Sequence, residues 1–480
     1  MADTDRELER KVDTYIDTVW DDVLDDISEL VSHPSVADYG AAQPGSPFGA
    51  DVRSALDCAL GIAKRLGYEV LDDEGYVGMA DIPGADGEQL ATIAHVDVVP
   101  AGPGWDTDPF KMERRDGWLL GRGVIDDKGP AVLSLYAGAF FLHEGIALKH
   151  PFRALLGCDE EVGMTDVHHY LAGHDDPAFL FTPDAEFPVC NAEKGQFGGT
   201  FSSAPVEGGA IVSWSGAEAA NAIPSQSILE LAVDASELPA PSAHADRIEV
   251  TSVSPGRTRV FAHGIGGHAS LPAGTLNAIG LAAGYLEEVA AARPGTLAPA
   301  ELDFLGLLSV LFADTDGTSA GIACENEAFG PLTLNAGTIC VHDGRLEQTV
   351  DIRHPDAITA DGLEAKLSAA AAAKGASFTV DSVKPAFSTS AESPAVQALI
   401  AVYNEVTGDD ARPFSMGGGT YARNFARSVS FGPEEPDTVL PPFGGPMHGP
   451  NECASEELLR RALKIYILAI ARLQDVDLGE

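Results

Sequence analysis

The sequence predicts an α/β catalytic domain, a mixed sheet flanked by helices, with an α+β domain inserted into it. Helix-like and strand-like segments alternate up to Phe181, which is the rhythm of an α/β fold. From about Lys194 to Pro385 the texture changes to Ser- and Gly-rich strand candidates and Ala-rich helices. Because 480 residues also exceed the usual size of one core, we expect a catalytic domain of residues 1–193 and 388–480 and an inserted domain of residues 194–387.

The catalytic domain opens with a predicted amphipathic helix over residues 4–32, where apolar side chains recur at three- and four-residue spacings. Strand candidates punctuated by Gly and Asp follow at 68–71, 76–82 and 90–99. The apolar stretch 131–142 predicts a buried helix, and Pro130 suits its first turn.

The inserted domain carries strand candidates in SILELAVDA, DRIEVTSV, RTRVFAHGI, EQTVDIRHP and ASFTVDSV, with helices at 275–292 and 361–374. The catalytic domain then resumes with a helix over 394–406, the loop GGGTYAR and a strand near Val429. A closing helix is expected over 455–472, with acidic residues in its first turn.

The composition excludes several classes of partner. The chain has 73 Asp and Glu against 30 Lys and Arg, a net charge of −43, which repels nucleic acids and anionic membranes. We read neither a secretion signal nor a membrane anchor, since the first residues are polar and no apolar run approaches membrane-spanning length. Six cysteines without CxxC spacing indicate reduced thiols. We therefore expect a cytoplasmic protein.

Seven acidic and imidazole residues stand in a fixed order in short motifs. They are His95 and Asp97 in AHVDVVP, Asp126 in GRGVIDDKGP, Glu160 and Glu161 in GCDEEVG, Asp184 in FTPDAEF and His448 in GPMHGPNE. Several of these motifs directly follow an apolar run, so the side chains are expected at strand ends, where α/β sheets build sites. Two histidines with several carboxylates and no cysteine favour zinc, cobalt or manganese in a catalytic site.

A two-metal hydrolase site is the chemistry that this residue set suits. Two divalent ions about 3.5–4 Å apart can share one water, lower its pKa and polarise an amide carbonyl. Such a site needs a bridging carboxylate, further ligands on each ion and one carboxylate left as base. Taken singly, the residues have plainer explanations, since a lone histidine is commonly a core residue and DEE a solvated turn. The ordered series favours the metal site.

The segments HVDVVPAGPGW, GRGVIDDKGP, DEEVG and PDAEF, in this order, resemble the metallopeptidase family that includes carboxypeptidase G, acetylornithine deacetylase, aminoacylase and carnosinase. The segments FTPDAEFPVCNAEKG, GGHASLPAGTLNA and GGGTYAR are most similar to its PepV-type dipeptidases. The resemblance runs from about residue 40 to the end. It implies the phosphorylase/hydrolase-like fold of zinc exopeptidases and two Zn²⁺ per chain, for which Co²⁺ or Mn²⁺ can substitute.

The resemblance also implies a ligand set. In it His95 and Asp184 bind one ion, and Glu161 and His448 bind the other. Asp126 bridges the two ions. These five assignments are implied by motif matches and not by spacing.

Three further roles near the metals follow from the same resemblance. Asp97 is the partner that orients His95, and Glu160 is the base that moves a proton from water to the leaving amine. The peptide after the bridging aspartate tends to be cis in this family, so Asp127 is expected to shape the backbone and not to take part in the chemistry. Lys128 is expected to have a structural role.

The resemblance also implies four contacts to the substrate, all from residues after Asp184. His268 in GIGGHASLP corresponds to a histidine that stabilises the oxyanion, and Arg353 in VDIRHP to an arginine that binds the substrate carboxylate. Asn221 in EAANAIP and Gly418 in the GGGTY loop are further expected contacts. The plainer alternatives are a solvated turn histidine and an edge-strand arginine, and His263 has no motif match.

The size of the inserted domain bears on function. In PepV-type enzymes an enlarged lid supplies from the same chain what a dimer partner supplies elsewhere, so the resemblance implies a monomeric dipeptidase whose closing lid limits substrate length. An N-acyl-amino-acid amidohydrolase, of the succinyl-diaminopimelate desuccinylase or acetylornithine deacetylase type, shares every ligand and remains the alternative. A catalytically silent binding protein requires an unseen defect. The proline-rich segment FGPEEPDTVLPPFGGPMHGPNE departs from the family pattern and bears on the amino-side pocket.

The net charge of −43 generates a prediction about salt. Self-repulsion of this size opposes compaction unless ions screen it, which is typical of adaptation to high salt; the alternative is a proteome that is merely acidic. Under the first hypothesis we expect the midpoint of thermal unfolding to rise along a KCl series, as followed by circular dichroism. A midpoint indifferent to KCl contradicts salt adaptation.

Overall fold

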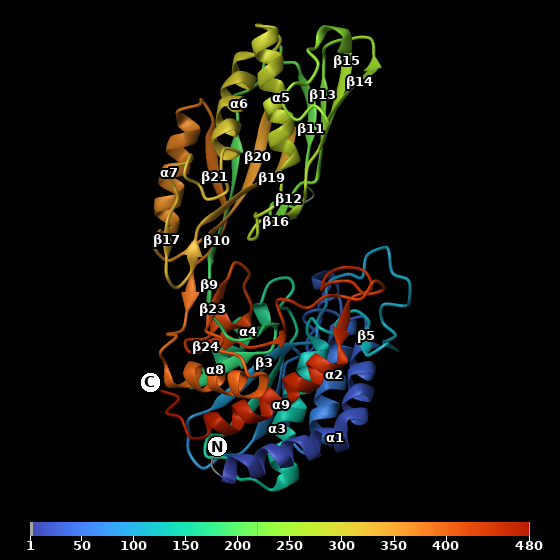
Figure 1. Cartoon of the computed structure of the whole chain (residues 1–480), viewed down its shortest axis with the longest axis vertical. Helices are drawn as coiled ribbons and strands as arrows, with labels where there is room; N and C mark the ends of the chain where they lie inside the picture. Colours follow the sequence, from blue (N-terminus) through green and yellow to red (C-terminus); the bar gives the residue numbers. More distant parts are fainter. Residues whose placement is uncertain (1–2, 218, 480) are drawn as a thin grey trace. The chain divides into compact units, whose positions relative to one another are not determined.

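The computed structural model describes residues 3–217 and 219–479 and divides into two compact units (Figure 1). The catalytic unit runs to Asn191 and takes in Ser388–Phe414 and the chain from Gly419 on. The inserted unit comprises Ala192–Phe387 and Ser415–Gly418. Each unit has its own apolar core.

The catalytic unit is built on a mixed sheet in the order β1-β2-β6-β3-β7-β24-β9. Its four central strands β6, β3, β7 and β24 are parallel, whereas β1, β2 and β9 pair antiparallel with their neighbours. The strands are β1 Glu69–Asp73, β2 Val77–Ile82, β3 Leu90–His95, β6 Phe152–Gly157, β7 Phe179–Thr182, β9 Cys190–Glu193 and β24 Ser428–Ser430. The carboxyl ends of the four parallel strands therefore lie at the same edge of the sheet.

Both faces of this sheet are buried by helices. Side chains alternate along β3, so that Leu90 and Ala94 join the core under α1, α3 and α9, while Ala91 and Ile93 pack on the α4 side. Figure 1 shows α1, α3 and α9 side by side. The helices are α1 Asp3–Val31, α2 Ala50–Arg65, α3 Lys128–Glu144, α4 Thr165–Gly173, α8 Pro394–Thr407 and α9 Glu456–Leu473. This arrangement confirms the predicted α/β domain with a mixed sheet.

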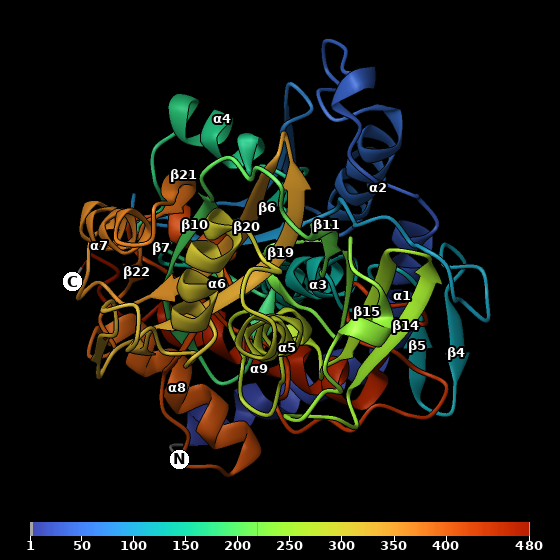
Figure 2. The same cartoon turned by 90° about the horizontal axis from the view of Figure 1, so that it is seen from above.

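The inserted unit combines two four-stranded sheets with three helices around one core. One sheet has the order β19-β20-β10-β21 and the other β11-β13-β15-β14, and helices α5 and α6 pack against them (Figure 2). The strands are β10 Gly195–Ser202, β11 Ile211–Ser215, β13 Gln226–Leu231, β14 Ile248–Ser254, β15 Arg257–His263, β19 Thr333–His342, β20 Arg345–His354 and β21 Ser377–Lys384. The helices are α5 Ala278–Ala292, α6 Pro299–Leu311 and α7 Ala360–Ala372. The α+β character of this unit confirms the prediction.

Shorter elements complete both units. In the catalytic unit β5 pairs with both β4 and β26, β8 pairs with β25, and η1 and η3 are short 3₁₀ turns. The short strands are β4 Glu113–Arg115, β5 Trp118–Leu120, β8 Ala185–Glu186, β12 Ala222–Ile223, β16 Gly267–His268, β17 Glu325–Asn326, β18 Gly330–Pro331, β22 Phe387–Ser388, β23 Phe414–Met416, β25 Pro433–Glu434 and β26 Cys453–Ser455. The 3₁₀ helices are η1 Tyr39–Ala41, η2 Ala235–Glu237 and η3 Tyr421–Asn424.

Three long strands of the inserted unit, β10, β11 and β19, were not predicted. Strand β10 has the sequence GQFGGTFS, whose glycines read as turns. In the sheet these glycines make room for aromatic rings, because a Cβ on Gly199 would lie 2.2 Å from the ring of Phe378. That ring lies 4.5 Å from the ring of Phe201, centroid to centroid. Strand β3 also ends at His95 and not at 99 as expected.

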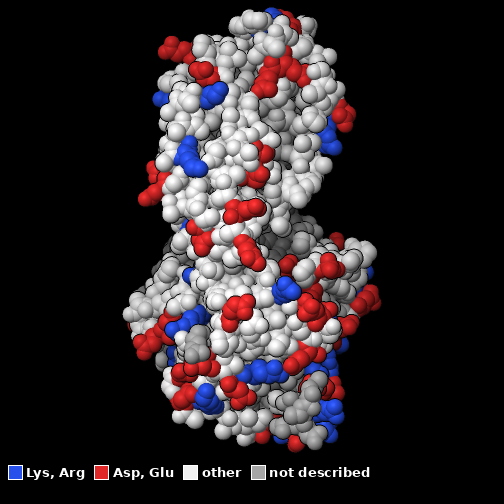
Figure 3. Space-filling view, turned by 60° about the vertical axis from the view of Figure 1, so that its left-hand side comes forward, with Lys and Arg blue, Asp and Glu red and all other residues white. Residues whose placement is uncertain are grey.

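The acidic side chains are spread over the surface and are not gathered in one patch on the face drawn in Figure 3. Lys and Arg side chains on this face mostly have an acidic neighbour. Among the described helices, none is long and apolar enough to cross a membrane.

Candidate metal centre

The predicted ligands emerge from neighbouring strand ends of the catalytic unit. Strand β3 ends at His95, Glu161 lies four residues beyond the end of β6, and Asp184 lies two beyond the end of β7. These strands are parallel neighbours, so the three side chains meet at one edge of the sheet. Asp126 precedes α3, and His448 comes from the loop before β26.

Asp126 lies at the middle of the cluster. Its Oδ1 is 3.0 Å from His95 Nε2, and its Oδ2 is 2.9 Å from His448 Nε2. His448 Nε2 is also 3.1 Å from Glu161 Oε2, and His95 Nε2 is 3.7 Å from Asp184 Oδ2. One carboxylate thus faces both imidazoles with one oxygen each, as a bridging ligand requires.

The donor atoms are close enough for metal ions. Donors of His95, Asp126 and Glu161 lie within 4.8 Å of one another, and so do those of His95, Asp127 and Asp184. Imidazole nitrogens and carboxylate oxygens without a thiolate fit Zn²⁺, Co²⁺ or Mn²⁺. The residues present therefore fit the divalent metal that the sequence predicted, and the assignment of each ligand to one ion stays a prediction.

Without metal, the imidazoles of this cluster hold protons tightly. Burial alone would lower the pKa of His95, but hydrogen bonds to Asp126 and Asp97 and nearby carboxylate charges raise it well above its usual value. Hydrogen bonds to Asp126 and Glu161 raise the pKa of His448 to about 10. Protons therefore occupy the imidazole positions where a metal would bind.

The pKa values of the carboxylates shift in opposite directions, although burial acts the same way on each. Burial opposes ionisation of Asp126, but its hydrogen bonds to His448 and His95 outweigh burial and lower its pKa. Burial and the charge of Asp126 raise the pKa of Asp184 to about 7. Burial and the charge of Asp184 raise the pKa of Glu160 well above its usual value. A site with so many buried carboxylates favours cations.

Asp97 contacts both His95 and the segment that carries the expected base. Its backbone carbonyl lies 2.9 Å from His95 Nδ1, and its carboxylate Oδ1 is 3.4 Å from the same nitrogen. The carboxylate accepts hydrogen bonds from the backbone N–H groups of Glu160, at 3.3 Å, and Glu161, at 3.2 Å. Asp97 therefore orients the ring largely through its backbone and fixes the neighbouring loop through its side chain.

Asp127 and Lys128 are buried beside the cluster. The Asp126–Asp127 peptide is cis. Asp127 Oδ2 accepts a hydrogen bond from the backbone N–H of His95 at 3.1 Å, so its carboxylate contacts the site, a role the sequence reasoning did not foresee. Lys128 Nζ donates to the carbonyl of His33 at 2.6 Å, in keeping with its predicted structural role.

Sequence reasoning missed Glu452, which is fully buried behind Asp126. Its Oε1 accepts hydrogen bonds from the backbone N–H groups of Gly123, Ile125 and Asp126, at 3.0, 3.2 and 3.4 Å. Its Oε2 lies 2.5 Å from the guanidinium of Arg122, which also donates to the carbonyl of Gly449. Glu452 thus joins the segments that carry Asp126 and His448. The sequence offered one signal for this residue, since Glu452 ends the segment HGPNE that begins with the expected ligand His448.

The inserted unit brings Asn221 and His268 together. Strands β12 and β16 pair so that Ala222 lies opposite His268, and the N–H of Ala269 donates to the carbonyl of Asn221 at 2.8 Å. The Asn335 side chain, which sequence reasoning missed, donates to the carbonyls on either side of Asn221, of Ala220 and Ala222, both at 3.0 Å. Asn221 and His268 are both exposed. The backbone on either side of Asn221 is fixed by the Asn335 side chain.

His268 is held in one tautomer when it is neutral. The backbone N–H of Ser270 donates to its Nδ1 at 3.2 Å, and the Ser270 hydroxyl lies 2.7 Å from the same nitrogen. A backbone N–H can only donate, so Nδ1 is the acceptor and Nε2 carries the hydrogen. The ring therefore presents Nε2–H as a hydrogen-bond donor, as an oxyanion contact requires.

Arg353 lies buried on β20 and is oriented by its own strand. Its Nε and Nη2 donate to the two carboxylate oxygens of Asp351, at 2.6 and 3.0 Å, and its Nη1 donates to the carbonyl of Gly417 at 2.7 Å. Gly417 packs so closely on Ser270 that a Cβ there would lie 2.4 Å from the serine Cβ. The loop of Gly418 is thus beside both Arg353 and the residues that follow His268.

Comparison with known proteins agrees with this geometry. Residues 91–472 match the family described as Peptidase family M20/M25/M40. The chain belongs to this family. The metallopeptidase family predicted from the motifs is thereby confirmed, and with it the expectation that this peptidase depends on a divalent metal.

Two similar relatives of this M20-family chain extend over almost its whole length. It is 30% identical over 454 residues to the "Putative dipeptidase YtjP" of Bacillus subtilis (strain 168), covering 92% of this chain and 94% of that protein. It is 29% identical over 461 residues to the Beta-Ala-Xaa dipeptidase of Lactobacillus delbrueckii subsp. lactis, covering 93% and 94%. The fold resembles that of Dug1p from Saccharomyces cerevisiae, with a TM-score of 0.60 at 12% identity over 97% of this chain and 98% of that one.

The raised pKa values predict that metal binding releases protons. Asp184, with a pKa of about 7, and His448, with a pKa of about 10, bind protons in the metal-free protein at neutral pH, so a metal must displace them. We expect Zn²⁺ affinity to rise as the pH increases from 7 to 10. Calorimetric titration at pH 7.5 in two buffers of different ionisation enthalpy measures the release. A binding heat that does not depend on the buffer contradicts it.

Removing the charge of Glu452 tests its role as a brace. We expect Glu452→Gln to weaken metal binding on the order of 10–100-fold, because the amide can no longer pair with Arg122 and the Asp126 segment loosens. Competition with a chelator measures the affinity, and thermal unfolding monitors the fold. Glu301→Gln is the matched control, since Glu301 is also fully buried and accepts backbone N–H bonds, from Ala210 and Ile211. If Glu452→Gln and Glu301→Gln bind the metal with equal affinity, the proposed role of Glu452 in fixing the Asp126 segment is contradicted.

Proposed function

We propose that this chain is a metal-dependent dipeptidase that hydrolyses the peptide bond of short substrates with a free carboxylate. The observation that carries the proposal is the convergence of five metal-ligand side chains on one sheet edge, with Glu160 beside them and Asp97 holding its backbone. The relatives named as dipeptidases, which align over more than nine-tenths of the chain, support the substrate class.

In the proposed enzyme His95 and Asp184 would hold one Zn²⁺, Glu161 and His448 would hold the second, and Asp126 would be a ligand of both. Bound there, the ions would supply the chemistry that lowers the pKa of a water molecule and polarises the scissile carbonyl. Two zinc ions, with Co²⁺ or Mn²⁺ as substitutes, match a donor set of imidazoles and carboxylates.

Glu160 is the proposed general base. Glu160 is half-buried, and both burial and the charge of Asp184 raise its pKa, which suits a group that must accept a proton and release it again. Glu160 takes the proton of the attacking water and delivers it to the leaving amine nitrogen. Asp97 fixes the start of this loop, so the base is positioned before substrate binds.

Residues of the inserted domain, which we propose acts as the lid, complete the reaction. His268 donates its Nε2–H to the oxyanion, and the tautomer set by Ser270 supports this role. Arg353, whose guanidinium is held in plane by Asp351, binds the substrate carboxylate with its planar fork. Asn221 and Gly418 are the accompanying substrate contacts.

A cavity in the catalytic unit favours a substrate with a free amine over an acylated one. The cavity, of about 200 Å³, is bordered by Ile125 and Met447, the neighbours of Asp126 and His448. Glu186 and Glu434 line it and stand opposite each other in the β8–β25 pair. Burial and the charge of Glu186 raise the pKa of Glu434 to about 8, so the adjacent carboxylates share either a proton or a cation. A substrate ammonium group supplies that charge, whereas an N-acyl group does not.

The same reasoning gives a proposal for assembly and location. The enlarged inserted domain supplies the substrate contacts from within the chain, so we propose a monomer. The net charge of −43 opposes contact with nucleic acid and anionic membranes and is consistent with a cytoplasmic enzyme.

A substrate panel on metal-reconstituted protein tests this function. We expect kcat/KM for L-Ala-L-Ala and β-Ala-L-Ala to exceed that for N-acetyl-L-alanine and N-succinyl-diaminopimelate by on the order of 100-fold, because the acylated substrates leave the carboxylates of the cavity unpaired. Glu434→Gln should lower the ratio of kcat/KM for dipeptides to kcat/KM for acylated substrates. The control Glu405→Gln should not, since Glu405 pairs with Arg472 and does not line the cavity. Preference for an acylated substrate would favour the amidohydrolase alternative.

Glu160→Gln separates catalysis from metal binding in the same panel. We expect kcat to fall by on the order of 1000-fold, the usual contribution of a general base, while the variant still binds the metal content of the wild type. Wild-type protein without amidase activity in Zn²⁺, Co²⁺ or Mn²⁺ favours a catalytically silent protein.

A further inference from the structure

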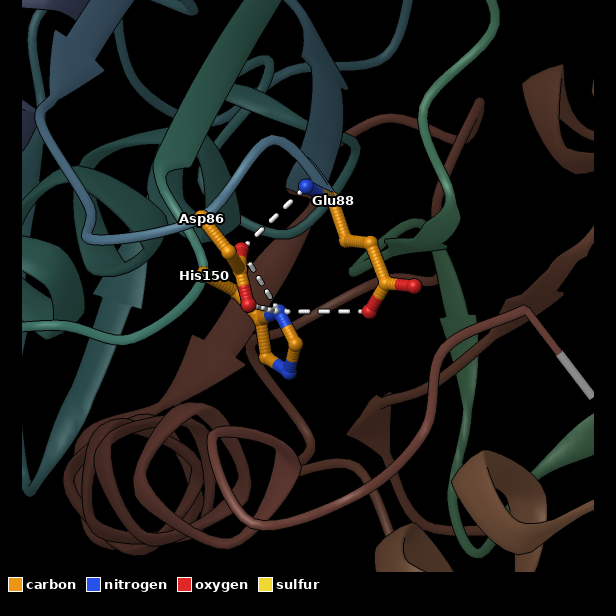
Figure 4. Close-up of side chains that lie close together, drawn as sticks. All are labelled: Asp86, Glu88 and His150. Carbon is orange, nitrogen blue, oxygen red and sulfur yellow. Dashed lines mark hydrogen bonds and ion pairs between the residues drawn. The ribbon is translucent and has the colours of Figure 1, made fainter.

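A second cluster of metal-ligand side chains lies at the opposite end of strand β3. Asp86 and Glu88 come just before β3 begins at Leu90, whereas His95 of the metal centre ends it. A strand of six residues spans about 20 Å, so this cluster is separate from the metal centre. His150 joins it from the segment before β6 (Figure 4).

The three side chains converge on one nitrogen. His150 Nδ1 is 3.1 Å from the Asp86 carboxylate and 3.6 Å from Glu88 Oε2. The donor atoms of all three residues lie within 4.8 Å of one another. The imidazole is fully buried, while the carboxylates keep 32% and 46% of their side-chain surface exposed, which leaves room for water beside them.

The other ring nitrogen of His150 indicates what Nδ1 can bind. Nε2 lies 3.0 Å from the backbone carbonyl of Val476, which can only accept, so a hydrogen on Nε2 is donated to that carbonyl. In the neutral ring with that hydrogen, the Nδ1 lone pair faces two carboxylates, so a cation must lie between them, either a proton on Nδ1 or a metal ion. An imidazole that donates its second N–H to a carbonyl is the usual arrangement of a metal ligand.

The ammonium group of Lys149 also lies near His150, but next to Nε2 and not between the carboxylates. The distance from Lys149 Nζ to His150 Nε2 is 3.2 Å. If the Lys149 ammonium donates to Nε2, the hydrogen moves to Nδ1 and bonds to Asp86, and a metal has no lone pair to bind. The two arrangements differ in whether the cluster takes up a metal ion.

The backbone that carries these residues is held in place before any ion binds. The N–H groups of Ala85 and Asp86 donate to the carbonyl of Lys149, and Asp86 Oδ1 accepts from the N–H of Glu88 at 3.2 Å. The N–H groups of Lys149 and His150 donate to Gln474 Oε1, at 2.8 and 2.9 Å. The three ligands are therefore positioned relative to one another, which lowers the cost of binding an ion.

We propose that Asp86, Glu88 and His150 bind a divalent transition-metal ion, Zn²⁺ or Mn²⁺, in a structural site. One imidazole and two carboxylates, with water in the remaining positions, suit these ions better than Ca²⁺, which prefers six or more oxygens. The ion ties the loop before β3 to the segment after α9, through His150 and the Val476 carbonyl. It also offsets negative charge in a chain of net charge −43.

Zinc content of the full-length protein tests the site. Protein is stripped with a chelator, reloaded with Zn²⁺, desalted and analysed for zinc per chain by mass spectrometry. We expect the double variant Asp86→Asn/Glu88→Gln to hold one zinc ion fewer than the wild type, with unchanged kcat/KM for a dipeptide. The control Asp409→Asn/Asp410→Asn, which removes the same charge from an exposed loop without a histidine, should keep the wild-type content.

Unfolding measurements give a second readout. We expect added Zn²⁺ or Mn²⁺ to raise the unfolding midpoint of the wild type more than that of the double variant, and Ca²⁺ to have no such differential effect. Equal zinc content in wild type and double variant, or a differential effect of Ca²⁺ alone, overturns the proposal. The test does not depend on the proposed dipeptidase activity, because zinc content is compared whether or not the protein turns over a substrate.

Discussion

The crowding of buried carboxylates around Asp126 is the constraint on which the catalytic unit depends. The sheet delivers Glu161 and Asp184 to one edge, and Asp126 meets them from the loop before α3. Burial disfavours each charge, and only positive charge, on the imidazoles or on metal ions, offsets it. The packed helices beneath the sheet hold the strand ends in place, so these groups cannot move apart. The fold therefore maintains an arrangement that cations stabilise.

Backbone groups do much of the orienting in both units. Asp97 and Glu452 fix loops of the metal centre by accepting backbone N–H bonds. In the inserted unit Asn335 holds the Asn221 segment through carbonyls, and the Ser270 N–H sets the tautomer of His268. Contacts of this kind constrain position without tying up the reactive atoms of the side chain they orient.

Much of the fold and of the metal centre could be predicted because the signals are local. Several ligand motifs directly follow an apolar run, and the helix spacing of residues 4–32 is visible within a few turns. The contacts that were missed depend on distant residues. Glu452 and Gly123 are 329 positions apart. The glycines of β10 are typical of a turn in the sequence, and only the distant ring of Phe378, which packs against Gly199, explains them in a strand. The pairing of Asn335 with the Asn221 segment leaves no local trace either.

The brace formed by Glu452 has a consequence for how the protein is made. The carboxylates from Asp126 to Asp184 are all synthesised in the first half of the chain, but His448 and Glu452 come only near its end. A nascent or truncated chain that stops before His448 thus has most of the acidic ligands but neither the second imidazole nor Glu452, which fixes the Asp126 loop. The full set of expected ligands, and the carboxylate that fixes the Asp126 loop, are therefore present only after the segment with His448 and Glu452 has been made.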